Sequence, residues 1–115
     1  MDEKDYLYSA DCKINSFLMV PWVLITDLTF RKLSMESKVL YAMMLDRVGL
    51  STKNNWLDEL GRVFIYYTVD EIIEKMGCCK QKALKLLNEL KEFGLIECER
   101  IGLTKPNRIY VKTFY

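Results

Sequence analysis

The sequence predicts a single α+β domain that is mostly helical and ends in a small antiparallel sheet. Residues 68–93 have the apolar periodicity of two helices separated by a glycine. Two short stretches that alternate apolar and polar residues follow, and the segment between them contains Gly, Pro and Asn. At 115 residues, half of them apolar, the chain is long enough for one hydrophobic core but not for two domains. This order of elements predicts a winged helix-turn-helix with a C-terminal wing hairpin.

The N-terminal part of the chain is expected to lead into the domain without forming a core helix. Residues 1–13 are charged and aromatic without periodicity and predict an arm ahead of a domain at 14–115. Residues 14–25 are rich in β-branched and aromatic side chains, and Pro21 excludes them from the centre of a sheet, so we expect an extended segment or an edge strand. Its large apolar side chains leave two alternatives open, which are pairing with a second copy of the chain and packing within its own subunit.

The first long helix is expected to start after Ser34, a good N-cap residue, and to continue to about Val48. Residues 49–55 contain Gly, Ser and Asn, which favour turns, so we expect the helix to end there. Residues 63–67 form a compact β-branched and aromatic run and predict a short strand.

The second helix is predicted to start at Thr68. Thr68 and Glu71 match the capping box, in which the two side chains satisfy free backbone donors at a helix start. Gly77 is expected to end this helix, because glycine accepts the positive φ that other residues resist. The third helix is predicted at 79–93, and the two strands of the hairpin at 95–101 and 108–112.

The third helix is the candidate recognition helix. If its apolar stripe faces the core, its first turn and outer face present amide and ammonium groups to solvent. Gln can pair with adenine through two hydrogen bonds, and Lys can donate to guanine edges or to phosphates. The residues concerned are Lys80, Gln81, Lys82 and Lys85. For this helix alone, ordinary solubilising charge is an equally good explanation.

The tip of the hairpin is the second candidate contact. Lys105, Asn107 and Arg108 cluster beside Gly and Pro, where side chains project freely toward a phosphate or a minor groove. The charge distribution agrees, since residues 1–77 hold nine Lys and Arg against twelve Asp and Glu, whereas residues 78–115 hold eight against four. Double-stranded DNA is therefore the predicted partner.

Asp46 and Arg47, near the end of the first long helix, have two possible roles. Arg47 could contact a phosphate or a second subunit. Alternatively, the pair could fix the end of the helix through local hydrogen bonds and interaction with the helix dipole, which we favour.

The sequence gives little support to catalysis, metal binding or a cofactor. The chain has no histidine, and its four cysteines, at 12, 78, 79 and 98, lack the CxxC spacing of zinc sites. It contains no Gly-rich phosphate loop and no paired acids framed by glycines. We therefore expect no enzyme and neither a metal nor a cofactor.

The apolar run at 17–25 does not indicate export or a membrane. It is interrupted by Pro21 and is shorter than the roughly 20 residues that a membrane span requires. We expect a cytoplasmic protein that does not bind membranes.

Several motifs are more specific than the winged helix itself. The most specific are Leu45-Asp46-Arg47 and Lys105-Pro106-Asn107-Arg108-Ile109-Tyr110-Val111. Further pieces are Leu40-Tyr41, Asn55-Trp56, Lys80-Gln81-Lys82-Ala83 and Gly94-Leu95-Ile96-Glu97. Across about 17–112, these motifs resemble the N-terminal domain family of plasmid replication initiator A (RepA) proteins.

The resemblance implies a homodimeric winged-helix domain that binds repeated sites in the replication origin of a plasmid or mobile element and so initiates replication. It also implies that this chain is the N-terminal part of a longer initiator, whose separate C-terminal domain engages host replication proteins. The alternative function is a winged-helix transcriptional repressor on a palindromic operator.

Overall fold

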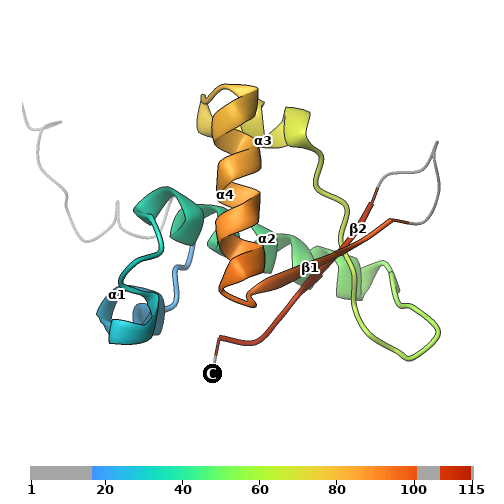
Figure 1. The fold of residues 1–115 in the computed structure, drawn as a ribbon. Helices are drawn as coiled ribbons and strands as arrows, with labels where there is room; N and C mark the ends of the chain where they lie inside the picture. The colour runs from blue at the N-terminus through green and yellow to red at the C-terminus, as the bar shows by residue number, and fades with distance from the viewer. Residues whose placement is uncertain (1–16, 101–106, 115) are drawn as a thin grey trace, which may run out of the picture.

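The computed structural model describes residues 17–100 and 107–114, and its helices pack around one core (Figure 1). The predicted arm at 1–13, the start of the predicted extended segment at 14–16 and the hairpin tip at 101–106 lie outside the described residues. Within the described ranges, no helix is both long and apolar enough to cross a membrane. The elements in order are α1 (Trp22–Thr26), the short 3-10 helix η3 (Leu28–Phe30), α2 (Met35–Lys53), α3 (Val69–Met76), α4 (Lys80–Glu92), β1 (Ile96–Glu99) and β2 (Arg108–Val111).

The core lies where α2, α3 and α4 meet. Figure 1 shows α4 crossing in front of α2 and below the turn that joins it to α3, so that its apolar side faces both helices. The side chains that α4 buries are the stripe expected from the sequence, namely Ala83, Leu86, Leu87 and Leu90. Opposite them lie fully buried side chains of α2 and α3, including Leu40, Tyr41, Met44 and Ile72. The 3.6-residue periodicity of the sequence therefore identifies the buried side of α4 correctly.

The helix-turn-helix is confirmed in its local details. The Thr68 hydroxyl accepts the backbone N–H of Glu71, and the Glu71 carboxylate accepts the N–H of Thr68, which completes the capping box. Gly77 ends α3 in the left-handed region at φ 62°, and its N–H donates to the Ile73 carbonyl at 2.9 Å. A residue with a Cβ would be strained at this backbone angle, so glycine fixes the sharp turn into α4.

The sheet is a two-stranded antiparallel hairpin with one further backbone bridge. In β1 and β2, Ile96 pairs with Val111 and Glu99 pairs with Arg108. The predicted strand at 63–67 is reduced to two isolated antiparallel bridges, one between Val63 and Leu57 and one between Ile65 and Ile109, and the second joins this segment to the hairpin. The backbone on either side of Ile65 has other partners, because the Phe64 N–H donates to the Trp56 carbonyl and the Tyr66 carbonyl accepts from Arg47. The sheet and the helices together confirm the winged-helix fold.

The prediction of an extended segment at 14–25 is wrong for its last residues. Trp22–Thr26 form α1, with Pro21 as the N-cap residue and the Leu24 N–H donating to the Pro21 carbonyl at 3.1 Å. Proline excludes a central strand, but its fixed φ also suits a helix start, and here the second property decides. Leu24 is fully buried and anchors the short helix on the core.

The predicted end of the first long helix near Val48 is also wrong, since α2 continues to Lys53. Gly49 lies within the helix and is exposed, so it costs helix propensity without breaking the backbone hydrogen bonds. The chain turns instead at Asn55, which adopts the left-handed conformation at φ 57°. Asparagine tolerates this backbone region better than most residues. The turn-forming residues at 49–55 therefore did indicate the end of the helix, but the chain turns at the last of them and not at the first.

Candidate nucleic-acid interface

The solvent-facing side of α4 presents a stripe of polar side chains. Gln81, Lys85 and Asn88 are exposed, and their spacing of four and three residues places them in a row along one helix face. Lys80 is exposed in the first turn. Cys79, the N-cap residue, makes no side-chain cap hydrogen bond, so it does not occupy the first N–H groups of the helix. These groups together can donate hydrogen bonds to base edges and phosphates.

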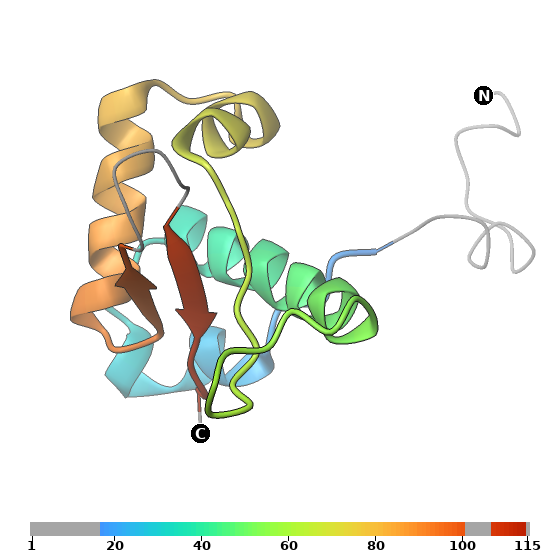
Figure 2. The same cartoon turned by 90° about the vertical axis from the view of Figure 1, so that its right-hand side faces the viewer.

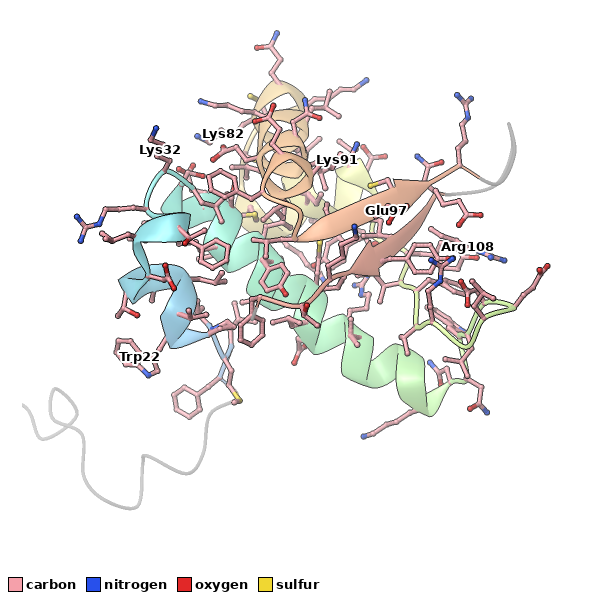
Figure 3. All side chains as sticks on the ribbon, turned by 60° about the horizontal axis from the view of Figure 1, so that its bottom comes forward. Trp22, Lys32, Lys82, Lys91, Glu97 and Arg108 are labelled. Atoms are coloured by element: carbon pink, nitrogen blue, oxygen red, sulfur yellow. The ribbon has the colours of Figure 1, made fainter. Side chains whose placement is uncertain are left out.

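Lys82 lies at the edge of this stripe and is engaged within the domain. Its ammonium nitrogen is 3.0 Å from Glu36 Oε2 on the first turn of α2, and its side chain is only 33% exposed. Hydrogen bonding to Glu36 raises the pKa of Lys82. Figure 3 shows Lys82 on the side of α4 toward Lys32. Of the four helix residues predicted from the sequence, the structure thus leaves Lys80, Gln81 and Lys85 directed to solvent.

Two contacts fix the orientation of α4 on the start of α2. The Glu89 carboxylate accepts the backbone N–H of Ser34 at 3.0 Å and the Ser34 hydroxyl at 3.3 Å. The Lys82 ion pair with Glu36 lies two turns earlier on α4. A carboxylate beside the first N–H groups of a helix is favoured by the helix dipole. The two contacts hold the polar stripe in one direction relative to the core.

Arg47 secures the start of α3. Its Nη1 lies 2.8 Å from Glu71 Oε2 and donates to the Tyr66 carbonyl at 2.8 Å, and its guanidinium lies 4.0 Å from the centre of the Tyr67 ring. Burial alone would raise the pKa of Glu71, but the hydrogen bond from Arg47 and the N–H of Thr68 outweigh it, so this pKa is lowered. Arg47 thus connects α2 with the capping box, instead of making the local contacts at a helix end that the sequence suggested.

The predicted wing residues are not grouped as expected. Lys105 lies outside the described residues, and Asn107 is exposed immediately before β2. Arg108 is half-buried, with its guanidinium 4.5 Å from the centre of the Phe64 ring (Figure 3). Hydrogen bonding to the Tyr110 side chain, with a further contribution from Tyr66, raises the pKa of Arg108. Arg108 therefore packs on the outer face of the sheet, in contrast to the freely projecting side chain that the sequence suggested.

A small loop at 56–63 covers the same face of the sheet. One Asp58 oxygen accepts the N–H groups of Leu60 and Arg62, and the other accepts the Arg62 side chain at 2.7 Å and the Tyr110 hydroxyl at 3.1 Å. Burial would raise the pKa of Asp58, but these hydrogen bonds lower it to about 2. The loop is therefore held firmly against β2 and supports the base of the hairpin.

The hairpin follows α4 directly along the chain and starts at the foot of this helix. In Figures 1 and 2 the strands rise from the foot of α4, and the end at which β1 stops and β2 begins lies higher than that foot in both views. A winged helix uses this arrangement to place one helix in a groove and the hairpin beside it.

Sequence reasoning missed two residues of this surface. Asn88 is exposed in line with Gln81 and Lys85. The spacing of these three residues in the sequence indicates that they share one face of a helix. Arg100 is exposed immediately after β1, at the loop end of the hairpin. The alternation of β1, in which Glu97 and Glu99 are exposed, did not by itself indicate Arg100.

A separate apolar groove of about 680 Å³ lies between the N-terminal segment and α2. Phe17, Met19 and Trp22 line it and are 71%, 83% and 77% exposed. Figure 3 shows Trp22 projecting from α1 away from the rest of the domain. Such a concentration of exposed large apolar side chains is typical of an interaction surface.

Comparison with known proteins places the chain among replication proteins. The chain is 30% identical over 112 residues to a 41 kDa protein of Lactobacillus helveticus. The aligned region covers 90% of this chain but only 31% of that relative. A solved structure described as the N-terminal domain of a DNA-binding protein superposes with a TM-score of 0.78 at 32% identity, covering 94% of this chain and 82% of the other. A solved structure described as a Rep–DNA complex superposes with a TM-score of 0.77 at 32% identity, covering 94% of this chain and 83% of the other. The structure of an MDR initiator superposes with a TM-score of 0.75 at 29% identity, covering 94% of this chain and 85% of the other.

The family model for the N-terminus of replication initiator protein A (RepA) matches residues 16–115, which include all the described residues and extend slightly beyond the motifs of the sequence at about 17–112. The chain therefore belongs to the RepA N-terminal family.

Proposed function

We propose that this domain binds double-stranded DNA sequence-specifically at repeated sites in a plasmid or mobile-element replication origin, as a step in initiating replication in the cytoplasm. The observation that carries the proposal is the row of Gln81, Lys85 and Asn88 on the exposed side of α4, the second helix of the helix-turn-helix. Amide and ammonium side chains in this position match the donor and acceptor pattern of base edges in the major groove. The proposal gives the domain a binding role and no catalytic step.

The wing contribution is proposed for Lys105, Asn107 and Arg100, with phosphates or the adjacent minor groove as their target. Arg108 is assigned a supporting role, because its guanidinium packs on Phe64 and contacts Tyr110. Lys82 supports the orientation of α4 through Glu36 in the same way. Engagement of host replication proteins is proposed for parts of an initiator outside this domain, since the chain spans 31% of the curated relative.

The test is a titration of the protein against three duplexes of equal length at one near-physiological salt concentration. The first carries the repeats of the origin, the second a scrambled sequence and the third a single palindromic operator. We expect the repeats to bind at least about 10³-fold more tightly than the scrambled DNA. Equal affinity for repeats and scrambled DNA would contradict the proposal, and a preference for the palindrome would favour a repressor.

We also propose that the domain is a homodimer that buries the apolar groove beside Trp22. Exposed Phe17, Met19 and Trp22 on one edge of α2 are the reason, since a twofold interface brings the same patch of each subunit together.

Sedimentation of the wild type and of Trp22→Glu tests the dimer. We expect the wild type to sediment as a dimer and the variant as a monomer, because a carboxylate would be buried without a partner in the interface. Leu60→Glu is the matched control, since Leu60 is 78% exposed in the loop at 56–63 and should leave the dimer intact. A monomeric wild type, or the same effect from both variants, would contradict this interface.

A further inference from the structure

One exposed side chain on the proposed recognition face is apolar. Leu84 is 43% exposed on α4, while the core side of the helix is already filled by Ala83, Leu86 and Leu87. It lies three residues after Gln81 and four before Asn88, so these three side chains are neighbours on the helix surface. Leu84 therefore places an aliphatic group between the two carboxamides of the stripe, beside Lys85.

This combination has a specific counterpart in the major groove. A carboxamide can hydrogen-bond to adenine N6 and N7 at the same time, and the thymine C5-methyl is the apolar group that the major groove exposes. Adjacent A·T and T·A pairs present the two features next to each other along the groove. A leucine between two carboxamides matches such a step better than it matches G·C pairs, whose major-groove edges carry no methyl group.

From this we propose that Leu84 is a specificity-determining residue that contacts a thymine methyl group within each repeat, between bases read by Gln81 and Asn88. The inference rests on the proposed function and adds the base composition of the contacted site. It also gives a reason for an aliphatic side chain at the centre of a polar helix face.

The experiment replaces each thymine of one repeat in turn by deoxyuridine, which removes only the C5-methyl group. Affinity is measured by fluorescence anisotropy for the wild type and for Leu84→Ala, a substitution that keeps helix propensity high. For the wild type we expect one thymine, or two adjacent ones, at which the replacement weakens binding about fourfold, the value for one buried methyl-sized group. For Leu84→Ala we expect the same replacement to have little effect, below about 1.5-fold.

Leu60→Ala is the control, because Leu60 is a more exposed leucine outside α4 and should retain the wild-type sensitivity. Circular dichroism confirms that each variant is folded. Tight repeat binding with no methyl-sensitive thymine, or with equal sensitivity in Leu84→Ala, would overturn the inference and leave the proposed function standing. Equal affinity of the wild type for repeats and scrambled DNA would instead overturn the proposed function and this inference together.

Discussion

Replacement of Arg47 by alanine is expected to lower the free energy of unfolding by about 2–4 kcal/mol, the largest effect on stability among the polar side chains described above. The reason is that one guanidinium holds three elements together. It pairs with Glu71 at the start of α3, donates to the Tyr66 carbonyl and lies over the Tyr67 ring. Its removal leaves a backbone carbonyl and a carboxylate without these partners. Urea unfolding followed by circular dichroism measures the difference.

The matched control is Arg31→Ala, which removes an exposed arginine after η3 and should change stability by less than about 0.5 kcal/mol. Arg47→Lys should lie between the two variants, because an ammonium keeps the charge but lacks the planar donor geometry of arginine. If Arg47→Ala and Arg31→Ala were equally stable, the structural role assigned to Arg47 would be wrong.

The contribution of Arg47 is also expected to depend on pH. The pKa of Glu71 in the folded protein is lowered from its ordinary value of 4.5, so the stabilisation from this ion pair is fully present above that value and is lost as the pH falls through the folded pKa. The stability difference between wild type and Arg47→Ala should therefore be constant near neutrality and should shrink in acid. In Glu71→Gln this shrinkage should be absent.

The largest effect on binding is expected when the stripe on α4 is removed. In the triple variant Gln81→Ala, Lys85→Ala and Asn88→Ala, discrimination between repeat-bearing and scrambled DNA should fall by roughly 10²-fold or more, and only about the fourfold contribution assigned to Leu84 should remain. Each base-edge contact contributes about 1–3 kcal/mol to the choice of base, and the variant removes all three. The measurement is the same titration at fixed salt.

Lys53→Ala is the matched control for this variant, since it also removes one positive charge but from the far end of α2. It should lower affinity for all duplexes only slightly and leave discrimination intact, because phosphate attraction carries no sequence information. The three α4 side chains are exposed, so the triple variant should unfold at the same urea concentration as the wild type. Unchanged discrimination in the folded triple variant would contradict the assignment of α4 as the reading helix.

The part of this arrangement that the sequence could predict is the part encoded locally. Apolar periodicity located α3 and α4, and the pair Thr68 and Glu71 marked the helix start because a capping box involves residues only three positions apart. Gly77 marked the turn for a similarly local reason. The order of helices and hairpin then followed, and with it the fold.

The functional side chains were harder to predict because their partners lie far along the chain. Lys82 and Arg108 looked like free cations, but the structure engages them with Glu36 and Phe64, which are more than 40 residues away in each case. Pro21 was compatible with either an edge strand or a helix start, and only the burial of Leu24 decides between them. Local patterns identify elements, whereas the availability of a charge depends on tertiary contacts.

The central claim is that the exposed side of α4 reads base edges in the major groove. Purine N7 is an acceptor that lies in this groove, and 7-deazapurines replace it by carbon while leaving the phosphates and Watson–Crick pairing in place. Affinity is therefore measured for the origin repeat and for the same repeat with 7-deazapurines, with a scrambled duplex carrying the same replacement as the reference. We predict that the replacement weakens binding to the repeat at least about tenfold and leaves the weak binding to scrambled DNA unchanged. Equal affinity for the two forms of the repeat would contradict major-groove reading by α4.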